Sequence, residues 1–325
     1  MSTLTHDKRI APPSRTAPGL VLALLSAASF ALSGPLAKGL IDSGWTAGAA
    51  VTARVLIAAA VLIGPALVAL RGRWFLVRRN LGLLVAYGLI AIAGCQLAYF
   101  NAVDHMEVGV AILIEFTSPV AVIGWLWFRH GQRPSRLTVA GAVLAIIGLM
   151  LVLNLVSGAD LDTVGVLWAL GAMAGAAFYW IISADEDNGL PGIVLAAGGL
   201  LVGGIVLLVA GLIGIVPIAT SRADVVLAGS PVPWWIPVTS LGVVTAGLAY
   251  VLGIAASRRL GSRLAAFVGL TEAVASVVFA WLLLDEAPAA IQLAGGVLIL
   301  LGVVAVRLGE PRVTSGPDVG DAATP

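Results

Sequence analysis

The stretch IEFTSPVAVIGWLWFRHGQRPSRLTVAGAVLAIIG, residues 114–148, aligns without a gap with VGLTEAVASVVFAWLLLDEAPAAIQLAGGVLILLG, residues 268–302. The constant offset of 154 residues pairs identical residues along the whole length: Val120 with Val274, Trp127 with Trp281, Pro134 with Pro288, Ala140 with Ala294, Gly141 with Gly295 and Gly148 with Gly302. Matches of alanine, glycine and valine could arise by chance in a chain rich in these residues. The matched tryptophan and proline are poorly explained in that way. The chain is therefore predicted to contain an internal repeat.

The composition indicates a membrane protein. Of the 325 residues, 60% are hydrophobic and 11% are charged, whereas soluble domains contain about 45–50% apolar and about 25% charged residues. Apolar runs of about 20 residues recur along the chain, and a run of this length spans the hydrocarbon core of a bilayer. A net charge of +1 without a basic tract gives no indication of a nucleic-acid partner. The single cysteine, Cys95, excludes a disulfide framework and a thiolate metal site.

Charged residues and Gly/Pro clusters divide the apolar runs into ten candidate transmembrane helices. The sequence thus predicts an all-α polytopic membrane protein. The expected spans are 18–40, 47–70, 81–103, 108–128, 136–156, 163–184, 190–216, 234–256, 263–284 and 287–307.

The lysines and arginines predict the orientation of these spans. If both termini are cytoplasmic, the inner segments hold all of the 18 cationic residues except Lys38, Arg54 and Arg222. Cytoplasmic loops carry the excess of Lys and Arg in multi-pass proteins. We therefore expect a cell-membrane protein with a cytoplasmic tail at 1–17 and a disordered cytoplasmic tail at 308–325.

The two copies of the repeat are predicted to have opposite orientations in the membrane. Each half, 18–156 and 163–307, contains five spans, and an odd number of spans forces the second copy to enter the membrane from the other side. The loops agree, because FRHGQRPSR at 128–136 is basic and inner, whereas its equivalent LLDEAPAA at 283–290 is acidic and outer. Inverted repeats with a site at their interface are the architecture of many secondary transporters.

Several motifs resemble those of the bacterial drug/metabolite transporter superfamily, in which each of two EamA-type repeats has five helices. They are Lys38 at the end of the first span, Ala53-Arg54 in the second, SPVAV at 118–122, LLLDEAP at 282–288 and a Gly-x6-Gly pattern in spans five and ten. PLAKGL at 35–40 with LIEFTSPVAV at 113–122 is similar to the threonine/homoserine exporter branch. The sequence departs from the family at Glu272-Ala273, where Glu-Pro is usual. The resemblance implies ten helices and transport rather than enzymatic activity.

Three ionisable residues lie inside predicted spans, namely Arg54, Glu115 and Glu272. Such residues normally face a bundle interior or a wet cavity, and they indicate functional sites. Glu272 is equivalent to Ser118 in the repeat, and Ser118 shares a helix face with Glu115 because residues i and i+3 are neighbours. We therefore expect both carboxylates in one central cavity. Reversible protonation during transport and structural neutralisation of Arg54 are both open roles for them.

Further candidates for binding substrate or protons are polar or aromatic residues within the spans. They are Gln96, Tyr99, Asn101, Ser118, Tyr179, Tyr250, Thr271 and Ser276, with Lys38, Pro119 and Trp180 as weaker candidates. Lys38 is expected to extend toward the outer interface. Pro119 interrupts its span beside Glu115, which is consistent either with a binding site or with a packing kink.

Two roles are open for Arg54. The first is an ion pair with Glu115 that fixes the second and fourth spans. The second is a clamp for a substrate carboxylate, because a guanidinium can bind a carboxylate through two parallel hydrogen bonds.

We expect a secondary transporter that exports small metabolites such as amino acids by alternating access around a central cavity. Its partners are the small-molecule substrate and membrane lipid, and no cofactor is expected apart from a proton as the alternative coupling ion. A membrane enzyme or a non-transporting scaffold is the rival class, and drugs or other amphipathic compounds are the rival substrates. The sequence disfavours the enzyme alternative, because its three histidines, His6, His105 and His130, are scattered and it has no phosphate-loop or metal-binding motif. No feature of the sequence indicates an oligomeric state.

Overall fold

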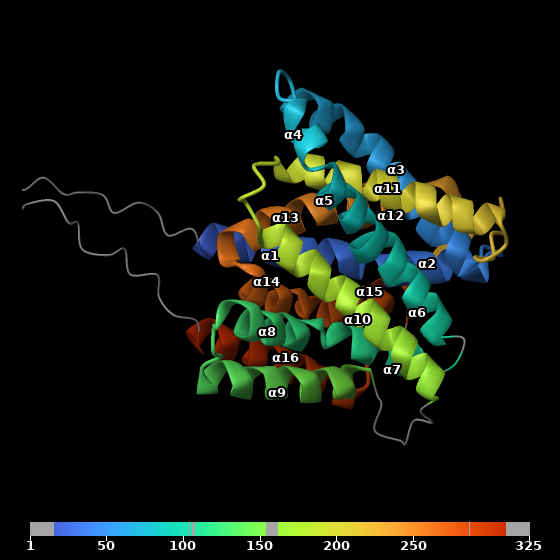
Figure 1. Ribbon diagram of the computed structural model, residues 1–325. Coiled ribbons are helices and arrows are strands. Elements are labelled where there is room, and N and C mark those ends of the chain that lie inside the picture. The colour runs from blue at the N-terminus through green and yellow to red at the C-terminus, as the bar shows by residue number, and fades with distance from the viewer. Residues whose placement is uncertain (1–15, 104, 106–107, 154–161, 286, 310–325) are drawn as a thin grey trace, which may run out of the picture.

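The apolar runs form helices throughout the described part of the chain, which in the computed structural model is residues 16–103, 105, 108–153, 162–285 and 287–309 (Figure 1). The two predicted tails therefore lie almost wholly outside the described residues. Nine helices among those residues are long and apolar enough to cross a membrane, and α9 is a shorter apolar helix. The protein is thus an all-α, multi-pass membrane protein with nine or ten candidate spans.

The first half consists of helices only. They are α1 (Thr16–Ala31), α2 (Ser33–Asp42), α3 (Ala47–Ala69), α4 (Phe75–Arg79), α5 (Leu81–Ala86), the π-helical segment η1 (Tyr87–Gly94), α6 (Cys95–Val103), α7 (Val108–Phe116), α8 (Ser118–His130) and α9 (Arg136–Val152). The short helix α4 lies in a loop where no helix was predicted. α9 ends at Val152, four residues before the expected end of that span, and residues 154–161 are not described.

The second half has its helices in the same order as the first half, with one additional β-hairpin. Its elements are α10 (Thr163–Ala184), α11 (Gly192–Leu212), β1 (Val225–Leu227), β2 (Ser230–Val232), α12 (Trp235–Gly242), the π-helical segment η2 (Val243–Leu248), α13 (Ala249–Leu260), α14 (Ser262–Gly269), α15 (Thr271–Leu284) and α16 (Ala290–Gly309). The hairpin was not predicted. Its two-residue turn, Ala228-Gly229, has positive φ at both residues, as a tight hairpin turn requires.

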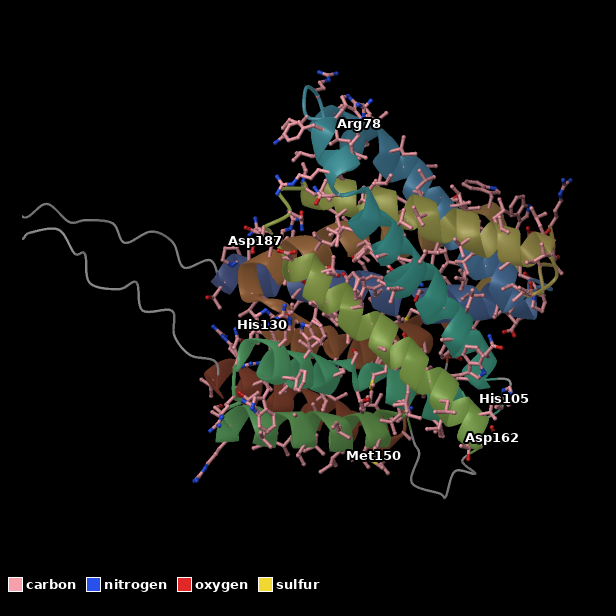
Figure 2. The ribbon with its side chains drawn as sticks, in the orientation of Figure 1. Arg78, His105, His130, Met150, Asp162 and Asp187 are labelled. Atoms are coloured by element: carbon pink, nitrogen blue, oxygen red, sulfur yellow. The ribbon has the colours of Figure 1, made fainter. Side chains whose placement is uncertain are left out.

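Successive connections alternate between the two ends of the helix bundle. In Figure 2, Arg78 lies at the top of the bundle and His130 and Asp187 lie at its left side, whereas His105 and Asp162 lie at the lower right. These residues belong to the loops that follow spans two, four and six and spans three and five, respectively. The alternation is the one expected for helices that cross a membrane in turn.

Equivalent helices of the two halves cross each other in opposite directions. α9 and α16 lie side by side (Figure 1), and a Cβ atom on Gly141 or on Gly148 would come 2.6 Å from the carbonyl oxygen of Gly302 or Gly295, respectively. Such closeness leaves no space for a side chain, so glycine permits the backbones to touch. Because the contact moves from 302 back to 295 as the first helix advances from 141 to 148, the two helices run antiparallel.

The fourth and ninth spans are interrupted at nearly equivalent residues. α7 and α8 meet at Thr117, and α14 and α15 meet at Leu270. Thr117 donates its hydroxyl hydrogen to the Ile114 carbonyl at 2.6 Å, and Thr271, its equivalent in the repeat, donates to the Val268 carbonyl at 2.7 Å. Pro119 lacks the N–H of the first break, but the second break forms with Ala273 in the equivalent place. The break in the ninth span therefore forms even though Ala273 stands where the resembling family usually has proline.

Candidate functional site

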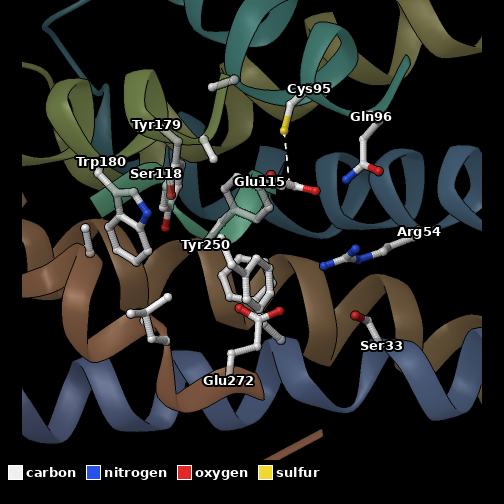
Figure 3. A pocket seen from close by; sticks show the side chains of 17 residues that line it. Ser33, Arg54, Cys95, Gln96, Glu115, Ser118, Tyr179, Trp180, Tyr250 and Glu272 are labelled. Carbon is white, nitrogen blue, oxygen red and sulfur yellow. Dashed lines mark hydrogen bonds between the residues drawn. The ribbon is translucent and has the colours of Figure 1, made fainter. Parts of the chain in front are cut away.

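Arg54, Glu115 and Glu272, the ionisable residues expected inside the spans, meet at a cavity of about 160 Å³, which Figure 3 shows from close by. Residues from both halves line it: Phe30, Ser33, Arg54, Ala91, Cys95, Gln96, Glu115, Phe116, Ser118, Ala176, Tyr179, Trp180, Tyr250, Ala266, Gly269, Leu270 and Glu272. The lining joins one guanidinium, two carboxylates and several aromatic rings. Its mixed character suits a ligand with both charged and apolar parts.

Some of the residues predicted for a site line this cavity and others do not. Those that line it are Arg54, Gln96, Glu115, Ser118, Tyr179, Trp180, Tyr250 and Glu272. Those placed elsewhere are Lys38, Tyr99, Asn101, Pro119, Thr271 and Ser276. Thr271 and Ser276 bond carbonyls of their own span, at Val268 and Ala273, and Asn101 bonds the Leu97 carbonyl at 2.7 Å.

Lys38 and Tyr99 contact other parts of the molecule. Lys38 forms an ion pair with Asp42 one helical turn away, with 3.6 Å between Nζ and Oδ2, and both side chains are exposed. Tyr99 packs beside the buried residues Ala102 and Val110. Pro119 is buried in the first turn of α8, where a missing N–H costs no helical hydrogen bond.

Arg54 binds the backbone of the other half of the chain. Its Nη2 donates to the Thr245 carbonyl at 2.7 Å, and Thr245 lies in η2, where the helical hydrogen bonds are shifted. Its guanidinium carbon lies 5.6 Å from the centroid of the Phe30 ring, within the range of a cation–π contact. Its Nε is buried and has no hydrogen-bond partner among the described residues. The guanidinium thus lines the cavity, while its Nε lies buried beside it.

Neither carboxylate of the cavity forms an ion pair with Arg54 in the described part of the chain. Glu115 instead accepts a hydrogen bond from the Cys95 thiol, with 3.4 Å between Sγ and Oε1 (Figure 3). The ion pair considered between Arg54 and Glu115 is therefore absent from this conformation. Glu115 lies near the C-terminal end of α7, just before the break at Thr117.

Two half-helices begin at the cavity. Ser118 is the first residue of α8, and Glu272 lies in the first turn of α15; the two residues are equivalent in the repeat. The N-terminal end of a helix has a partial positive charge, which favours an anion such as the Glu272 carboxylate. Interrupted helices that begin beside a central site are a recurring way for transporters to bind polar ligands.

Packed aromatic rings form another part of the cavity lining. The Tyr179 ring meets those of Tyr250 and Trp180 edge to face, with centroids 5.4 Å and 4.8 Å apart, and Phe30 packs on Tyr250 at 5.3 Å. The Tyr179 hydroxyl is buried without a hydrogen-bond partner among the described residues. The wall therefore offers an apolar surface, and the hydroxyl of Tyr179 lies behind it, against Gly253.

The sequence reasoning missed several lining residues. Ser33 and Phe30 flank the break between α1 and α2, which the Gly34-Pro35 pair could have indicated because proline removes a helical hydrogen bond. Cys95 could have been found from its position next to Gln96. Among the described residues, no group of three His, Cys, Asp or Glu residues comes together that could hold a metal ion.

Comparisons with known proteins agree with this architecture. The sequence model of the EamA-like transporter family matches residues 17–154 and again 163–308. The threonine/homoserine exporter RhtA of Salmonella typhimurium (strain LT2) is 29% identical over 231 residues, and that of Escherichia coli (strain K12) is 28% identical over 234 residues; each match covers 70% of both chains. A crystal structure has the same fold, with a TM-score of 0.71, 21% identity and coverage of 92% of this chain and 99% of its own.

The hydrogen bond of Arg54 predicts a specific pattern of stability. Arg54→Leu leaves the Thr245 carbonyl without its charged donor, so we expect a loss of about 1.5–3 kcal/mol. A second substitution, Glu115→Leu, is expected to give no rescue, because Glu115 is bonded to Cys95 instead. Thermal unfolding of the purified single and double variants in detergent measures both effects. Recovery of wild-type stability in the double variant would show that Arg54 and Glu115 form an ion pair after all.

Proposed function

Because the chain belongs to the EamA-like transporter family, we propose that it exports small metabolites such as amino acids by alternating access around the central cavity. The observation that carries this proposal is the meeting of Arg54, Glu115 and Glu272 at one cavity between the halves. The family consists of transporters, so the chain is not an enzyme. A scaffold would have no need of three ionisable groups around a cavity inside the membrane, where each is costly.

The cavity favours a small zwitterion as the substrate. The guanidinium of Arg54, which lines the cavity, suits a carboxylate, and the carboxylates of Glu115 and Glu272 suit an ammonium group. A volume of about 160 Å³ is below the ~300–1,000 Å³ of pockets for drug-sized ligands, which disfavours the drug alternative. The matched relatives are named as exporters of threonine and homoserine, two amino acids of suitable size.

In this proposal Arg54 is the substrate clamp. It remains attached to Thr245 through Nη2 while the residue lines the cavity. This attachment holds the guanidinium in place before the substrate arrives, so less side-chain entropy is lost on binding. The same bond links the second span of the first half to the eighth span, in the second half.

We further propose that the ten helices form two inverted repeats. The antiparallel crossing of α9 and α16 through equivalent glycines supports this arrangement. The π-helical segments η1 and η2 support it too, because they cover overlapping positions at the offset of 154 and pack on α11 and α3, which are equivalent spans. In such a pair, rocking of one repeat against the other exposes the site to each side in turn.

Coupling to protons is proposed through the two acids. Glu115 and Glu272 line one cavity without a cation within ion-pairing distance among the described residues. A carboxylate there can exchange a proton with whichever side of the membrane the cavity faces. The ammonium group of a substrate and a proton would then compete for the same carboxylates.

We propose that both termini are cytoplasmic, which puts Arg129 on the inner side and Arg222 on the outer side. In a Cys95→Ala background, a membrane-impermeant thiol reagent applied to intact cells should label Arg222→Cys and leave Arg129→Cys unlabelled. Both sites should react after the cells are opened, which controls for reactivity. Labelling of Arg129→Cys alone in intact cells would reverse the orientation.

Transport into liposomes tests the proposed function. Purified protein should take up labelled L-threonine or L-homoserine, and Arg54→Lys should lower the rate at least tenfold, because lysine cannot reproduce the bidentate fork. Glu115→Gln and Glu272→Gln should lower transport and abolish any stimulation by a pH gradient, since an amide cannot exchange a proton.

The matched control is Asp187→Asn, which changes an exposed acid in the loop between α10 and α11 and should transport at the wild-type rate. Circular dichroism and gel filtration should show that all the variants are folded. Wild-type rates from the Arg54 and both Glu variants would contradict a transport site at this cavity.

A further inference from the structure

A second hollow lies at one end of the bundle, away from the central cavity. It is a groove of about 490 Å³ between the start of α11 and the end of α13, which contact each other (Figure 1). Its lining is Glu186, Gly192, Ile193, Val251, Ala255, Arg258 and Arg259. None of these residues lines the central cavity, so transport leaves the groove unexplained.

One side of the groove is suited to a phosphate group. Arg258 donates from Nη2 to the Leu190 carbonyl at 2.9 Å, while its Nε is buried without a partner among the described residues. Arg259 follows in the last turn of α13 and is exposed. Two guanidinium groups at one groove form a site for an oxyanion, because their planar donor forks match its oxygens.

The first turn of α11 adds backbone donors beside Arg258. Its N-cap is Pro191, which provides no side-chain hydrogen bond. The Val194 N–H donates to the Pro191 carbonyl at 2.9 Å, which leaves the N–H groups of Gly192 and Ile193 for a ligand. A Cβ atom on Gly192 would lie 3.0 Å from Ile254 Cγ2 and 3.6 Å from Arg258 Nη1. The guanidinium of Arg258 therefore lies in van der Waals range of the start of this helix, and glycine at 192 leaves space for Ile254.

The other walls of the groove are apolar and continue into the membrane. Ile193 lies in the α11 span, and Val251 and Ala255 lie in the span that includes α13. Leu248, Val251 and Ala255 follow the spacing of one helix face, and Leu248 is 46% exposed. A ligand with a charged head and a hydrocarbon tail fits a groove with charged residues at its end and an apolar face below.

The carboxylate of Glu186 favours some lipid head groups over others. Glu186 is exposed at the rim of the same groove, where it would repel a head group that is purely anionic. It would attract a head group that also has an ammonium group. A phosphate beside the arginines and an ammonium beside Glu186 complement both signs of charge.

We propose that this groove binds a zwitterionic phospholipid with a primary ammonium, of the phosphatidylethanolamine type. The phosphate lies against Arg258, Arg259 and the first turn of α11, and the ammonium lies toward Glu186. An acyl chain follows Val251 and Ala255 into the bilayer. The site depends on the protein's location in a membrane and is independent of what the central cavity transports.

Native mass spectrometry of the full-length protein tests this proposal. Delipidated protein in detergent is titrated with phosphatidylethanolamine, phosphatidylcholine or phosphatidylglycerol with identical acyl chains. Phosphatidylethanolamine should bind at least threefold more tightly than either of the others, because phosphatidylcholine lacks N–H donors and phosphatidylglycerol lacks the cation. Equal binding of the three lipids, or preference for phosphatidylglycerol, would overturn the proposal.

Variants assign the binding to the groove. Arg258→Gln and Arg259→Gln should each weaken binding of phosphatidylethanolamine by about tenfold, the effect of losing a charge-assisted hydrogen bond. Glu186→Gln should remove the preference over phosphatidylcholine. Arg259 is exposed and donates to the Ala255 carbonyl of its own helix, so that variant remains informative if Arg258→Gln does not fold.

The matched control is Arg129→Gln, an exposed arginine in the last turn of α8, which should bind like the wild type. Uptake in liposomes is measured in parallel as a separate readout. A lipid preference that survives substitution of both Arg258 and Arg259 would place the lipid elsewhere and contradict the proposed site.

Discussion

The fold depends on how one guanidinium is accommodated inside a membrane. An arginine at the centre of a span costs about 2.5–3.5 kcal/mol on insertion scales, so Arg54 needs partners that lipid cannot supply. The structure provides the Thr245 carbonyl in a π-helical segment, the face of Phe30 and a polar cavity. The bond to Thr245 joins the two halves at the place where the cavity forms. The contacts that stabilise the charge of Arg54 are thus also contacts that build the cavity.

The repeat duplicates the framework but not the charges. Gly88 in η1 packs against Gly199 and Val202 of α11, and its equivalent Gly242 packs against Arg54 and Ile57 of α3. Gly199 and Val202 are three residues apart, and so are Arg54 and Ile57. Gly199 therefore occupies in the second half the position that Arg54 occupies in the first. Likewise, the residue equivalent to Glu115 in the repeat is Gly269, and the residue equivalent to Glu272 is Ser118. Small residues and helix breaks recur because they permit close backbone packing, whereas the ionisable residues are unique and give the cavity its polarity.

The sequence predicted the membrane spans and the family membership because hydropathy and repeats are properties of long segments, and the family match confirms the resemblance. It singled out Arg54, Glu115 and Glu272 because charges are rare in apolar runs. It could not supply the partner of Arg54, since a backbone carbonyl in a π-helical segment has no side-chain signature. Phe30 and Ser33 carry no charge, and the only sequence signal beside them is the Gly34-Pro35 pair, which indicates a break in the span but not a cavity. The ion pair between Lys38 and Asp42, by contrast, was readable from their spacing of four residues.

The central claim is that the cavity recognises both charges of a small zwitterion, and equilibrium binding tests it most directly. Isothermal titration of purified protein would compare L-threonine with its methyl ester, which lacks the carboxylate, and with N-acetylthreonine, which lacks the ammonium. The account predicts that threonine binds at least tenfold more tightly than either derivative, because each loses a charge-assisted hydrogen bond. It also predicts that Arg54→Lys reduces the advantage of threonine over the ester. Equal affinity for the three compounds would contradict recognition by Arg54 and the two acids.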